Sequence, residues 1–398
     1  MERKINILVL SFYFQPDLCA GSFRTTSLVK QLESMLIQGS QIDLVTTLPN
    51  RYNTFSQDAP ELENRFGLEI RRIALPPHQS GIVDQSKAFL SFSRRALKHV
   101  AKREYDLVFA TSSRLMTAVL GAWISGKKQV PLYLDIRDIF VDTIKDVLPS
   151  YLALIAKPVF SFLESWTVKR AVRINLVSRG FGGYFSSRYP GKEFSYFTNG
   201  IDDEFIAASL EANTEASVNS PLTVLYAGNI GEGQGLHKIL PSLAKMMEKR
   251  LHFKVIGDGG RKEALVQALA EEGVTNVELL PPLNRDRLIE AYQAANVLFL
   301  HLNDYDAFKK VLPSKLFEYA AIGKPIWAGI AGYPAEFVRS EISNSAVFSP
   351  CDADQATQVF ESLVLKITPR ADFIEKYARR NIAKDMALEI VDTAENIN

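Results

Sequence analysis

Short apolar segments of β character alternate with helix-length segments along most of the chain, and the same order recurs in both halves. The strand candidates of the first half are Ile5–Ser11, Ile42–Thr47, Leu107–Ala110, Leu132–Asp135 and Ile174–Ser178, with a helix predicted over Arg24–Leu36. Those of the second half are Leu222–Ala227, Phe253–Gly257, Val277–Leu280, Val297–Leu300, Pro325–Ala328 and Ala346–Ser349. Strands that alternate with helices predict parallel sheets covered by helices on both faces.

The 398 residues are enough for about two domains. Residues 206–220 are small and polar without strong periodicity, so we interpret them as a linker. The expected organisation is a Rossmann-like domain at 1–205, a second at 221–375, and a C-terminal helix at 376–398 that packs back on the first domain. Two such domains place a cleft between the carboxyl ends of their strands, where ligands of α/β sheets bind.

The overall charge of +1 conceals an asymmetry between the halves. Residues 1–200 contain 26 Lys and Arg against 17 Asp and Glu, whereas the remainder contains 20 against 28. A basic half joined to an acidic half favours an anionic partner for the first domain, and drift in surface charge explains it equally well. Cys19 and Cys351 form neither a disulfide framework nor a metal spacing, so a reducing, cytoplasmic compartment is expected.

No apolar run reaches the ~18 residues that a membrane-spanning helix needs. The nearest, Tyr151–Leu163, is interrupted by Lys157-Pro158, and a buried helix broken at the proline is slightly favoured over a segment lying on a membrane surface. Basic residues at 94–103 favour membrane contact, although a solvated helix face has the same composition. The N-terminus leads directly into a strand pattern, so no signal peptide is expected.

Two turns of the first half carry candidate ligand-binding residues. Gly21 lies where a turn opens a helix, and a glycine there lets a ligand phosphate approach the backbone and the positive helix end, although a plain turn looks the same. Arg137 and Asp138 follow the strand that ends at Asp135. They suit the binding of sugar hydroxyls or proton transfer, or else a local ion pair.

The corresponding turn of the second half is richer in glycine than a tight turn requires. The pattern therefore favours a cradle of backbone N–H groups for phosphate over a purely structural turn. The residues concerned are Gly228, Asn229, Gly231, Gly233 and Gly235. A further turn, Gly257–Arg261, is interpreted as a loop.

A third group of candidate residues begins at Lys310. Pro313 and Ser314 predict a helix start that puts Lys315 in the first turn, which opposes the helix dipole unless an anion offsets it. Glu318 lies one turn further on the same face, within reach of ribose hydroxyls. A surface ion pair between Lys315 and Glu318 is the alternative, and we consider it the weaker one.

Motifs of several other enzyme classes are absent from the sequence, which has no G-x-x-x-x-G-K-[ST], no H-E-x-x-H and no G-x-S-x-G. Asp304-Tyr305-Asp306 and Asp352-Ala353-Asp354 have the D-x-D form with which metal-dependent sugar transferases hold a cation. Because both follow late strands of the second half, we interpret them as loop residues. We expect no metal cofactor and no nucleic-acid partner.

In order and spacing, these segments resemble family 4 of the retaining GT-B glycosyltransferases over nearly the whole chain. The matching segments are the Gly21 loop, 38–47, 135–138, 177–178, 198–202, YAGNIG at 226–231, VIGDGG at 255–260, and 313–326. The subgroup to which the chain is most similar makes bacterial surface polysaccharides such as O-antigen and capsule. It includes transferases of N-acetyl-L-fucosamine.

The resemblance implies a UDP-sugar donor bound between two Rossmann-like domains without a metal. Carried over by position, the residues that line the diphosphate are Gly21, Gly228, Asn229 and Gly231, with Lys315 as their positive partner. Those that hold the ribose and face the donor sugar are Glu318, Arg137 and Asp138, and the donor-binding set also contains Lys310, Pro313 and Ser314.

The sequence departs from the family pattern in two places. The family's paired glutamates have seven residues between them, and Lys310 stands where the first, which usually contacts the donor sugar, is expected. After the Gly-Asn turn, Glu232 and Gln234 stand where a basic pair often follows. The first departure leaves the identity of the donor open.

The resemblance implies transfer of a hexosamine-type sugar from UDP to a lipid-linked saccharide, and we expect the protein to be bound peripherally at the inner face of the cell membrane. Backbone N–H groups and Lys315 would stabilise the charge that builds on the departing diphosphate. No protein nucleophile is identifiable, so no covalent intermediate is expected. Two alternatives stay open: a non-hydrolysing UDP-sugar 2-epimerase, and a non-catalytic subunit of a transferase complex.

Overall fold

The computed structural model of the protein describes residues 3–17, 19–49, 58–76, 82–112, 115–139, 141, 150–210 and 221–396. The chain forms two compact units, one made of Met1–Asn199 with Arg379–Asn398 and the other of Gly200–Ala378. The first unit therefore ends before the expected residue 205. Phe205 explains the difference, because it is buried and stacks on Tyr292 of the second unit. Of the expected linker, residues 206–210 end a helix and residues 211–220 lie outside the described residues.

The first unit contains an eight-stranded sheet in the order β3-β4-β2-β1-β5-β6-β7-β8, parallel throughout except for the β3–β4 hairpin. Every strand predicted for this half is present, and the hairpin is an addition. Its second strand has only three apolar residues among charged ones, so its apolar run is short. The strands are β1 (Asn6–Leu10), β2 (Gln41–Thr47), β3 (Leu62–Arg65), β4 (Leu68–Ile73), β5 (Leu107–Thr111), β6 (Leu132–Ile136), β7 (Arg173–Leu176) and β8 (Phe194–Ser195).

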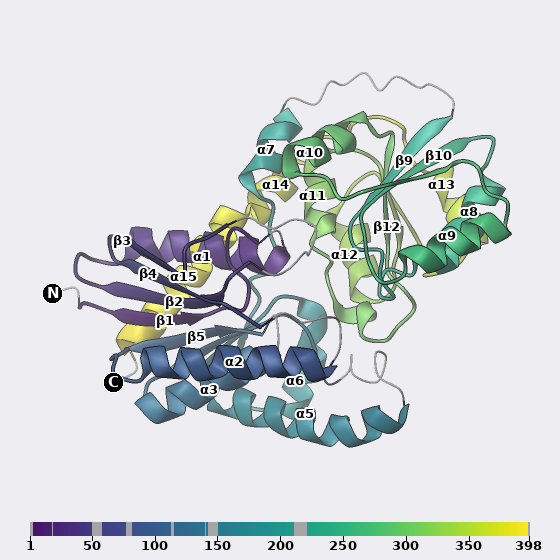
Figure 1. Cartoon of the computed structure of the whole chain (residues 1–398). Helices are drawn as coiled ribbons and strands as arrows, with labels where there is room; N and C mark the ends of the chain where they lie inside the picture. Colours follow the sequence, from purple (N-terminus) through teal and green to yellow (C-terminus); the bar gives the residue numbers. More distant parts are fainter. Residues whose placement is uncertain are drawn as a thin grey trace. The chain divides into compact units, whose positions relative to one another are not determined.

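Helices cover both faces of this sheet (Figure 1). Ile7 and Val9 of β1 face a core shared with helices α1 (Ala20–Met35) and α15 (Arg379–Asn396). Leu10, which points the opposite way, contacts Gly121 of α3 (Leu115–Lys128). The helix α3 packs beside both of its neighbours on that face, α2 (Ile82–Val100) and α5 (Ser150–Arg170). Alternate residues of one strand thus supply two cores, as expected of a sheet buried on both faces.

The structure corrects one interpretation of the segment Tyr151–Leu163. Helix α5 continues through Pro158 without a break, and it turns Glu164, Thr167 and Val168 inward. Val159 and Phe162 are exposed, so the described part of this segment is not a buried helix. Within the described residues, no helix has both the length and the apolar character needed to cross a bilayer.

The second unit has a six-stranded parallel sheet in the order β11-β10-β9-β12-β13-β14, and all the strands predicted for this half are present. Its core is aromatic, with Phe253, Phe299 and Trp327 packed together. The strands are β9 (Leu222–Ala227), β10 (Leu251–Ile256), β11 (Val277–Leu280), β12 (Val297–His301), β13 (Ile326–Gly329) and β14 (Ser345–Phe348). The helices are α7 (Asp203–Leu210), α8 (Leu236–Met246), α9 (Lys262–Glu271), α10 (Arg285–Ala294), α11 (Lys315–Ile322), α12 (Tyr333–Glu341), α13 (Ala353–Phe360) and α14 (Ala371–Tyr377).

Candidate functional site

The strand order of the second unit reverses between β9 and β12, and ligands of doubly wound sheets bind beyond the carboxyl ends of such strands. The glycine loop follows β9, and the segment that leads to Lys315 follows β12. Buried Asn303 joins the two loops, since its backbone N–H donates to the Gly233 carbonyl at 2.8 Å and its side-chain amide to the Glu232 carbonyl at 2.9 Å. The sequence analysis did not identify Asn303, although it lies just after a predicted strand.

The glycine loop packs closely against the next loop, Gly257–Arg261. The Gly228 N–H donates to the Ile256 carbonyl at 2.9 Å, and the Ile230 N–H donates to the Asp258 carbonyl at 2.8 Å. A Cβ atom on Gly257 would lie only 1.9 Å from the Gly228 oxygen, at a positive φ of 155°. Gly257 is therefore required to support the glycine loop, a role that the sequence analysis did not assign to it.

Several backbone N–H groups of the glycine loop are free to bind an anion. Within the part of the chain that the structure describes, those of Asn229, Gly231, Glu232 and Gly233 donate to no protein acceptor. Asn229 is exposed, and its side-chain amide donates to Gln234 Oε1 at 2.9 Å. Unpaired N–H groups in successive turn residues form an anion-binding concavity, which suits phosphate oxygens.

Helix α11 begins at Lys315, as predicted from Pro313 and Ser314, which are half-buried. The Lys315 Nζ donates to Glu318 Oε2 at 2.9 Å and to the Tyr292 hydroxyl at 3.2 Å. The ion pair that we considered the weaker alternative is thus present. It is not a surface pair, because the Glu318 side chain is only 10% exposed.

The ion pair leaves part of Glu318 available for a ligand. Tyr292 also donates to Glu318 Oε2, at 3.2 Å, whereas Oε1 accepts no hydrogen bond from any residue that the structure describes. A carboxylate oxygen is an acceptor only, so it suits ligand hydroxyls. Tyr319, the next residue of α11, accepts from the Ala227 N–H at 3.1 Å, which connects this helix to the residue before Gly228.

The remaining candidates of the second unit have local roles in the structure. Lys310 ends the short helix η2 (Phe308–Lys310), with its side chain half-buried. Asp304 and Asp306 both contact Lys309 Nζ, at 3.3 and 3.2 Å. Asp352 caps α13 by accepting from the Gln355 N–H at 2.8 Å. Three of the four aspartates in the two D-x-D segments, Asp304, Asp306 and Asp352, are therefore engaged in loop and cap contacts.

His301, at the end of β12, connects the glycine loop to β14. Its Nδ1 lies 2.6 Å from the Gln234 carbonyl, and its Nε2 accepts from the Cys351 N–H at 2.9 Å. Nδ1 must therefore carry the proton and donate it. Burial lowers the pKa of His301 to about 4, so the ring stays neutral in this position. The sequence analysis assigned no role to this histidine.

In the first unit, Asp135 pairs with a residue that the sequence analysis did not single out. The Arg24 guanidinium of α1 donates to both carboxylate oxygens of Asp135 at 2.8 Å, and also to the Phe197 and Thr198 carbonyls. Burial opposes ionisation of Asp135, but the charge and hydrogen bonds of Arg24 outweigh it, and the pKa is lowered. Asp135 therefore has a structural partner 111 residues away in sequence.

Arg137 and Gly21 come together at the start of α1. The Arg137 N–H donates to Ser112 Oγ at 3.0 Å, and its guanidinium donates to the Ala20 carbonyl at 3.3 Å. Gly21 is buried in the first helical turn, and the Cys19 side chain does not cap the helix by a hydrogen bond. The positive end of α1 and the Arg137 side chain thus lie next to each other at the carboxyl end of the sheet.

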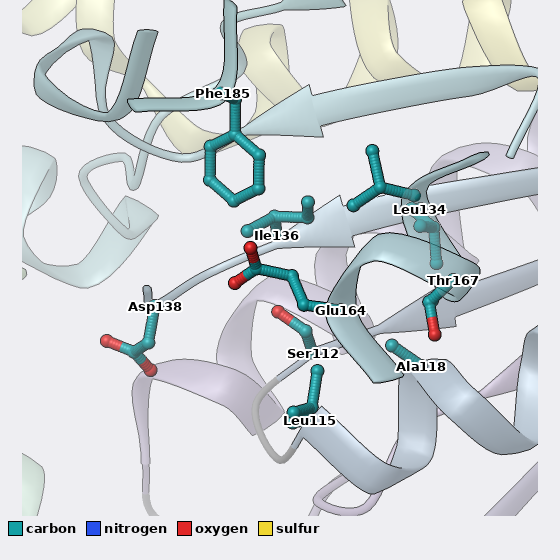
Figure 2. Close-up of a pocket in the computed structure, with 10 residues that line it drawn as sticks. Ser112, Leu115, Ala118, Leu134, Ile136, Asp138, Glu164, Thr167 and Phe185 are labelled. Carbon is teal, nitrogen blue, oxygen red and sulfur yellow. The ribbon is translucent and has the colours of Figure 1, made fainter. Parts of the chain in front are cut away.

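Asp138 lies at the wall of a small cavity that also contains Ser112 and Glu164 (Figure 2). The cavity offers about 20 Å³ of space, which is room for about one water molecule and none for a sugar. The Asp138 side chain reaches solvent, yet the protein atoms crowded around it raise its pKa to about 6 against the opposing charge of Arg137. Tyr184 and Tyr189 both donate to Glu164, at 3.0 and 3.1 Å.

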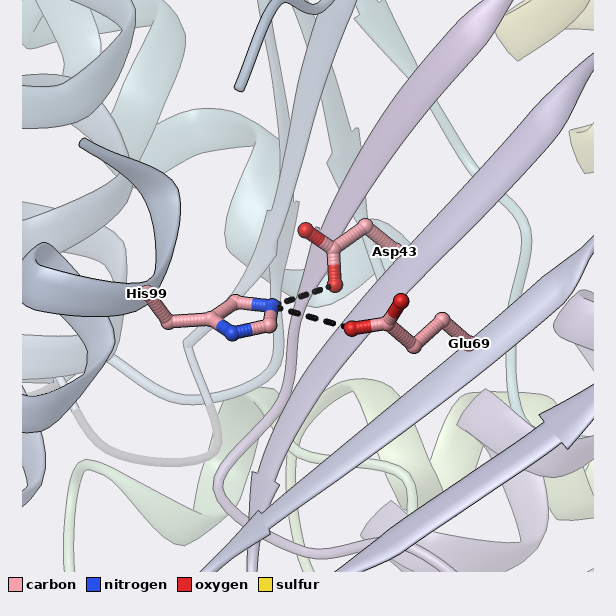
Figure 3. A group of neighbouring side chains, drawn as sticks. All are labelled: Asp43, Glu69 and His99. Carbon is pink, nitrogen blue, oxygen red and sulfur yellow. Dashed lines mark hydrogen bonds and ion pairs between the residues drawn. The ribbon is translucent and has the colours of Figure 1, made fainter. Parts of the chain in front are cut away.

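A group of three possible metal ligands, Asp43, Glu69 and His99, lies between β2, β4 and α2 (Figure 3). The His99 Nε2 is 2.9 Å from Asp43 and 3.6 Å from Glu69. Arg103 is within 3.3 Å of Asp43 and 2.6 Å of Glu69, and Tyr105 donates to Asp43. Because Arg103 already forms ion pairs with both carboxylates, the group is an ion-pair network in which His99 links α2 to the sheet.

Comparisons with known proteins match the two units separately. The sequence profile of the group 1 glycosyl transferases matches residues 210–380, and that of the glycosyl transferase 4-like domain matches residues 23–193. WcaI of Escherichia coli (strain K12), named as a colanic acid biosynthesis glycosyl transferase, is 32% identical over 100 residues. That stretch is 25% of this chain and 24% of WcaI, so the match spans about a quarter of that relative.

Solved structures resemble the chain over its whole length. Sucrose-phosphate synthase from Thermosynechococcus elongatus has a TM-score of 0.66 at 15% identity, covering 98% of this chain and 96% of its own. HepE of Anabaena, solved in complex with UDP-glucose, has a TM-score of 0.62 at 15% identity, covering 98% and 97%. WaaG, a glycosyltransferase involved in lipopolysaccharide biosynthesis, has a TM-score of 0.60 at 14% identity, covering 98% of each chain. At such identities the common property is the fold.

Proposed function

We propose that the chain transfers a sugar from a nucleotide donor to a saccharide acceptor, because its two halves match the profiles of the group 1 and the 4-like glycosyl transferases and its fold is of the GT-B type. The observation that carries the proposal is the switch point of the second unit. There the loop with the unpaired N–H groups follows Ala227, whose N–H donates to the Tyr319 hydroxyl of α11, and the same helix carries Lys315 and the free oxygen of Glu318. A diphosphate and a ribose need these two kinds of group next to each other.

The proposed donor is a UDP-linked N-acetylated amino sugar such as N-acetyl-L-fucosamine, and the proposed acceptor is a lipid-linked saccharide at the inner face of the cell membrane. The UDP-glucose complex of HepE supports a uridine nucleotide. The names of WcaI and WaaG, in colanic acid and lipopolysaccharide biosynthesis, support a surface polysaccharide such as O-antigen or capsule. We propose further that no metal cofactor is needed, and chelation during the assay tests this point directly.

In the proposed reaction, the bond between the anomeric carbon and the β-phosphate breaks while the acceptor hydroxyl bonds to the same face of that carbon. The hydroxyl proton passes to the departing phosphate. The N–H groups of the loop and Lys315 stabilise the negative charge that grows on this phosphate. Glu318 orients Lys315 through the 2.9 Å contact and binds the ribose with its other oxygen. Arg137 and Asp138 face the donor sugar.

The Lys315→Ala variant tests the role of this group. We expect turnover to fall about 100-fold or more, because a cation that stabilises the transition state is lost, while thermal stability stays near that of the wild type. Lys309→Ala is the matched control, since this neighbouring lysine pairs with Asp304 and Asp306. Near-normal turnover of Lys315→Ala would remove Lys315 from the mechanism.

A donor screen tests the proposal as a whole. UDP-sugars are incubated with lipid-linked acceptor analogues, and the products are identified by mass spectrometry. We expect one UDP-sugar to be consumed only when an acceptor is present. Formation of an epimer without acceptor would instead identify an epimerase, and calorimetry that detects no UDP-sugar binding would indicate a non-catalytic subunit.

A further inference from the structure

Three neighbouring helices of the first unit, α2, α3 and α5, carry exposed apolar side chains that its core does not use. Trp123 of α3 is 50% exposed and Phe162 of α5 is 68% exposed. Further exposed apolar residues are Leu90 and Leu97 on α2 and Val159 and Trp166 on α5. Single exposed apolar residues are ordinary, but a set with two tryptophans and a phenylalanine on adjacent helices indicates a binding surface.

The spacing of these residues places them on the outward face of each helix. Lys87, Leu90, Arg94 and Leu97 recur at intervals of three, four and three residues, and Val159, Phe162, Trp166 and Lys169 repeat the same intervals. Residues three and four apart in a helix share one face. On α3, Lys127 follows Trp123 by four residues, and its ammonium lies 5.4 Å from the tryptophan ring. Each of the three helices thus presents apolar and basic side chains side by side.

The charge of this surface has one sign. The three helices contain nine Lys and Arg but only two acidic residues, Asp84 and Glu164, and Glu164 is buried. Seven of the basic side chains are exposed, and none of them pairs with an acidic side chain in the described part of the chain. They are Lys87, Arg94, Arg95, Lys98, Lys127, Lys157 and Lys169.

The occupant that matches this chemistry is an anionic lipid bilayer. Tryptophan and phenylalanine enter the interface between headgroups and acyl chains, and nearby lysines and arginines are attracted to acidic headgroups. Tryptophan is favoured at this depth because its ring is apolar while its N–H remains hydrated. A second copy of the chain fits less well, because two identical basic faces repel each other.

We propose that the outer face of α2, α3 and α5 docks on an anionic bilayer, with Trp123, Phe162 and Trp166 inserted and the lysines and arginines on the headgroups. Docking through this surface would bring the enzyme to a lipid-linked acceptor. Only this link to the acceptor rests on the proposed function. Glu164 and Thr167 of α5 line the same small cavity as Asp138, which follows β6 at the carboxyl edge of the sheet. The docked face therefore extends alongside the edge that carries the candidate residues of the first unit.

Co-sedimentation of the full-length protein with vesicles tests the surface. The probes are vesicles of phosphatidylcholine alone and of phosphatidylcholine with phosphatidylglycerol. We expect binding only to the second kind, weakening as salt rises. The triple variant Trp123→Ser, Phe162→Ser, Trp166→Ser should weaken binding about tenfold or more, and Lys87→Glu, Arg94→Glu, Lys127→Glu should do the same.

Phe66→Ser is the matched control, because Phe66 is 82% exposed in the β3–β4 turn, outside the three helices. Its vesicle binding should equal that of the wild type, and circular dichroism melts should show all variants folded. The proposal is overturned if the wild type ignores anionic vesicles, if Phe66→Ser weakens binding as much as the triple variant, or if sedimentation velocity finds a dimer through this face without vesicle binding. Sugar transfer to a water-soluble acceptor should be unchanged in the triple variant, so failure of docking and failure of the proposed transfer are distinguishable.

Discussion

Arg24 and Asp135 form the buried ion pair that connects α1 to the central strands of the first unit. Both side chains are almost fully buried, and the arginine also donates to the Phe197 and Thr198 carbonyls. Asn175 adds a hydrogen bond to Asp135 at 2.7 Å. A buried charge that loses its partner is costly, so the pair has a large effect on stability when broken from one side.

Replacing Arg24 by Gln should lower the free energy of unfolding by about 3–5 kcal/mol, because it leaves Asp135 buried without its counter-charge. Asp135→Asn should act similarly, and the double variant should cost much less than the sum of the single variants. Urea denaturation measures all three. Arg65→Gln, at an exposed pair with Glu63, serves as control and should cost less than about 1 kcal/mol. Strict additivity of the Arg24 and Asp135 variants would contradict their coupling.

His301 should make the stability of the protein depend on pH. Its pKa is about 4 in the folded protein against 6.5 for the ordinary group, so between these values the unfolded chain binds more protons. The free energy of unfolding must therefore fall as the pH falls from about 6.5 to about 4, by about 3 kcal/mol at most. Denaturation curves recorded at several pH values across this range give the free energy of unfolding at each. This free energy should depend less steeply on pH for His301→Gln than for the wild type. Equal slopes would show that His301 does not govern this dependence.

The two glycine loops after β9 and β10 form one structural element. Gly257 and Gly259 permit the close approach of the second loop to Gly228 and Ile230. The free N–H groups of the first loop can bind a ligand only while the packing of the second loop keeps them in this orientation. The glycines of the first loop thus suit a ligand, whereas Gly257 and Gly259 of the second loop are explained by loop packing.

Gly257→Ala should destabilise the protein by at least about 2 kcal/mol and abolish UDP binding, because the new Cβ collides with the Gly228 oxygen. Gly260→Ala is the control in the same loop. A Cβ there meets nothing within 4 Å, so stability should change by less than about 0.5 kcal/mol. Thermal melts and UDP titration by calorimetry measure both effects. If the two variants behave alike, the packing of Gly257 against Gly228 does not support the glycine loop.

At the scale of the whole molecule, the last helix decides how the chain is divided into units. The helix α15 leaves the second unit at Ala378 and completes the first, where Met386, Ala387 and Ile390 join a core built by β1, β2, β5 and α1. The first unit is therefore not finished until the end of the chain is in place. Each unit has its own core, so damage to one need not spread to the other.

Ile390→Asp should unfold the first unit selectively, because it places a charge in that core. Hydrogen exchange read by mass spectrometry should show loss of protection in α1, β1, β2 and β5, with protection retained in β9 to β14. Leu388→Asp provides the control on the same helix, since Leu388 is exposed. Equal loss of protection in both units would show that the chain unfolds as one cooperative body.

The sequence by itself determined the parallel strands of both halves and the start of α11 at Lys315, because their apolar periodicity and the Pro313-Ser314 start signal are local properties. The β3–β4 hairpin was not predicted, because its many charged residues obscure the alternation of apolar and polar positions that marks a strand. Only the tertiary structure decided that Asp135 pairs with Arg24, that Gly257 supports Gly228, and that Trp123, Phe162 and Trp166 face outward on adjacent helices. These contacts and orientations depend on which residues, far apart in the sequence, come together in the fold. The local sequence of a segment does not specify the segment against which it packs.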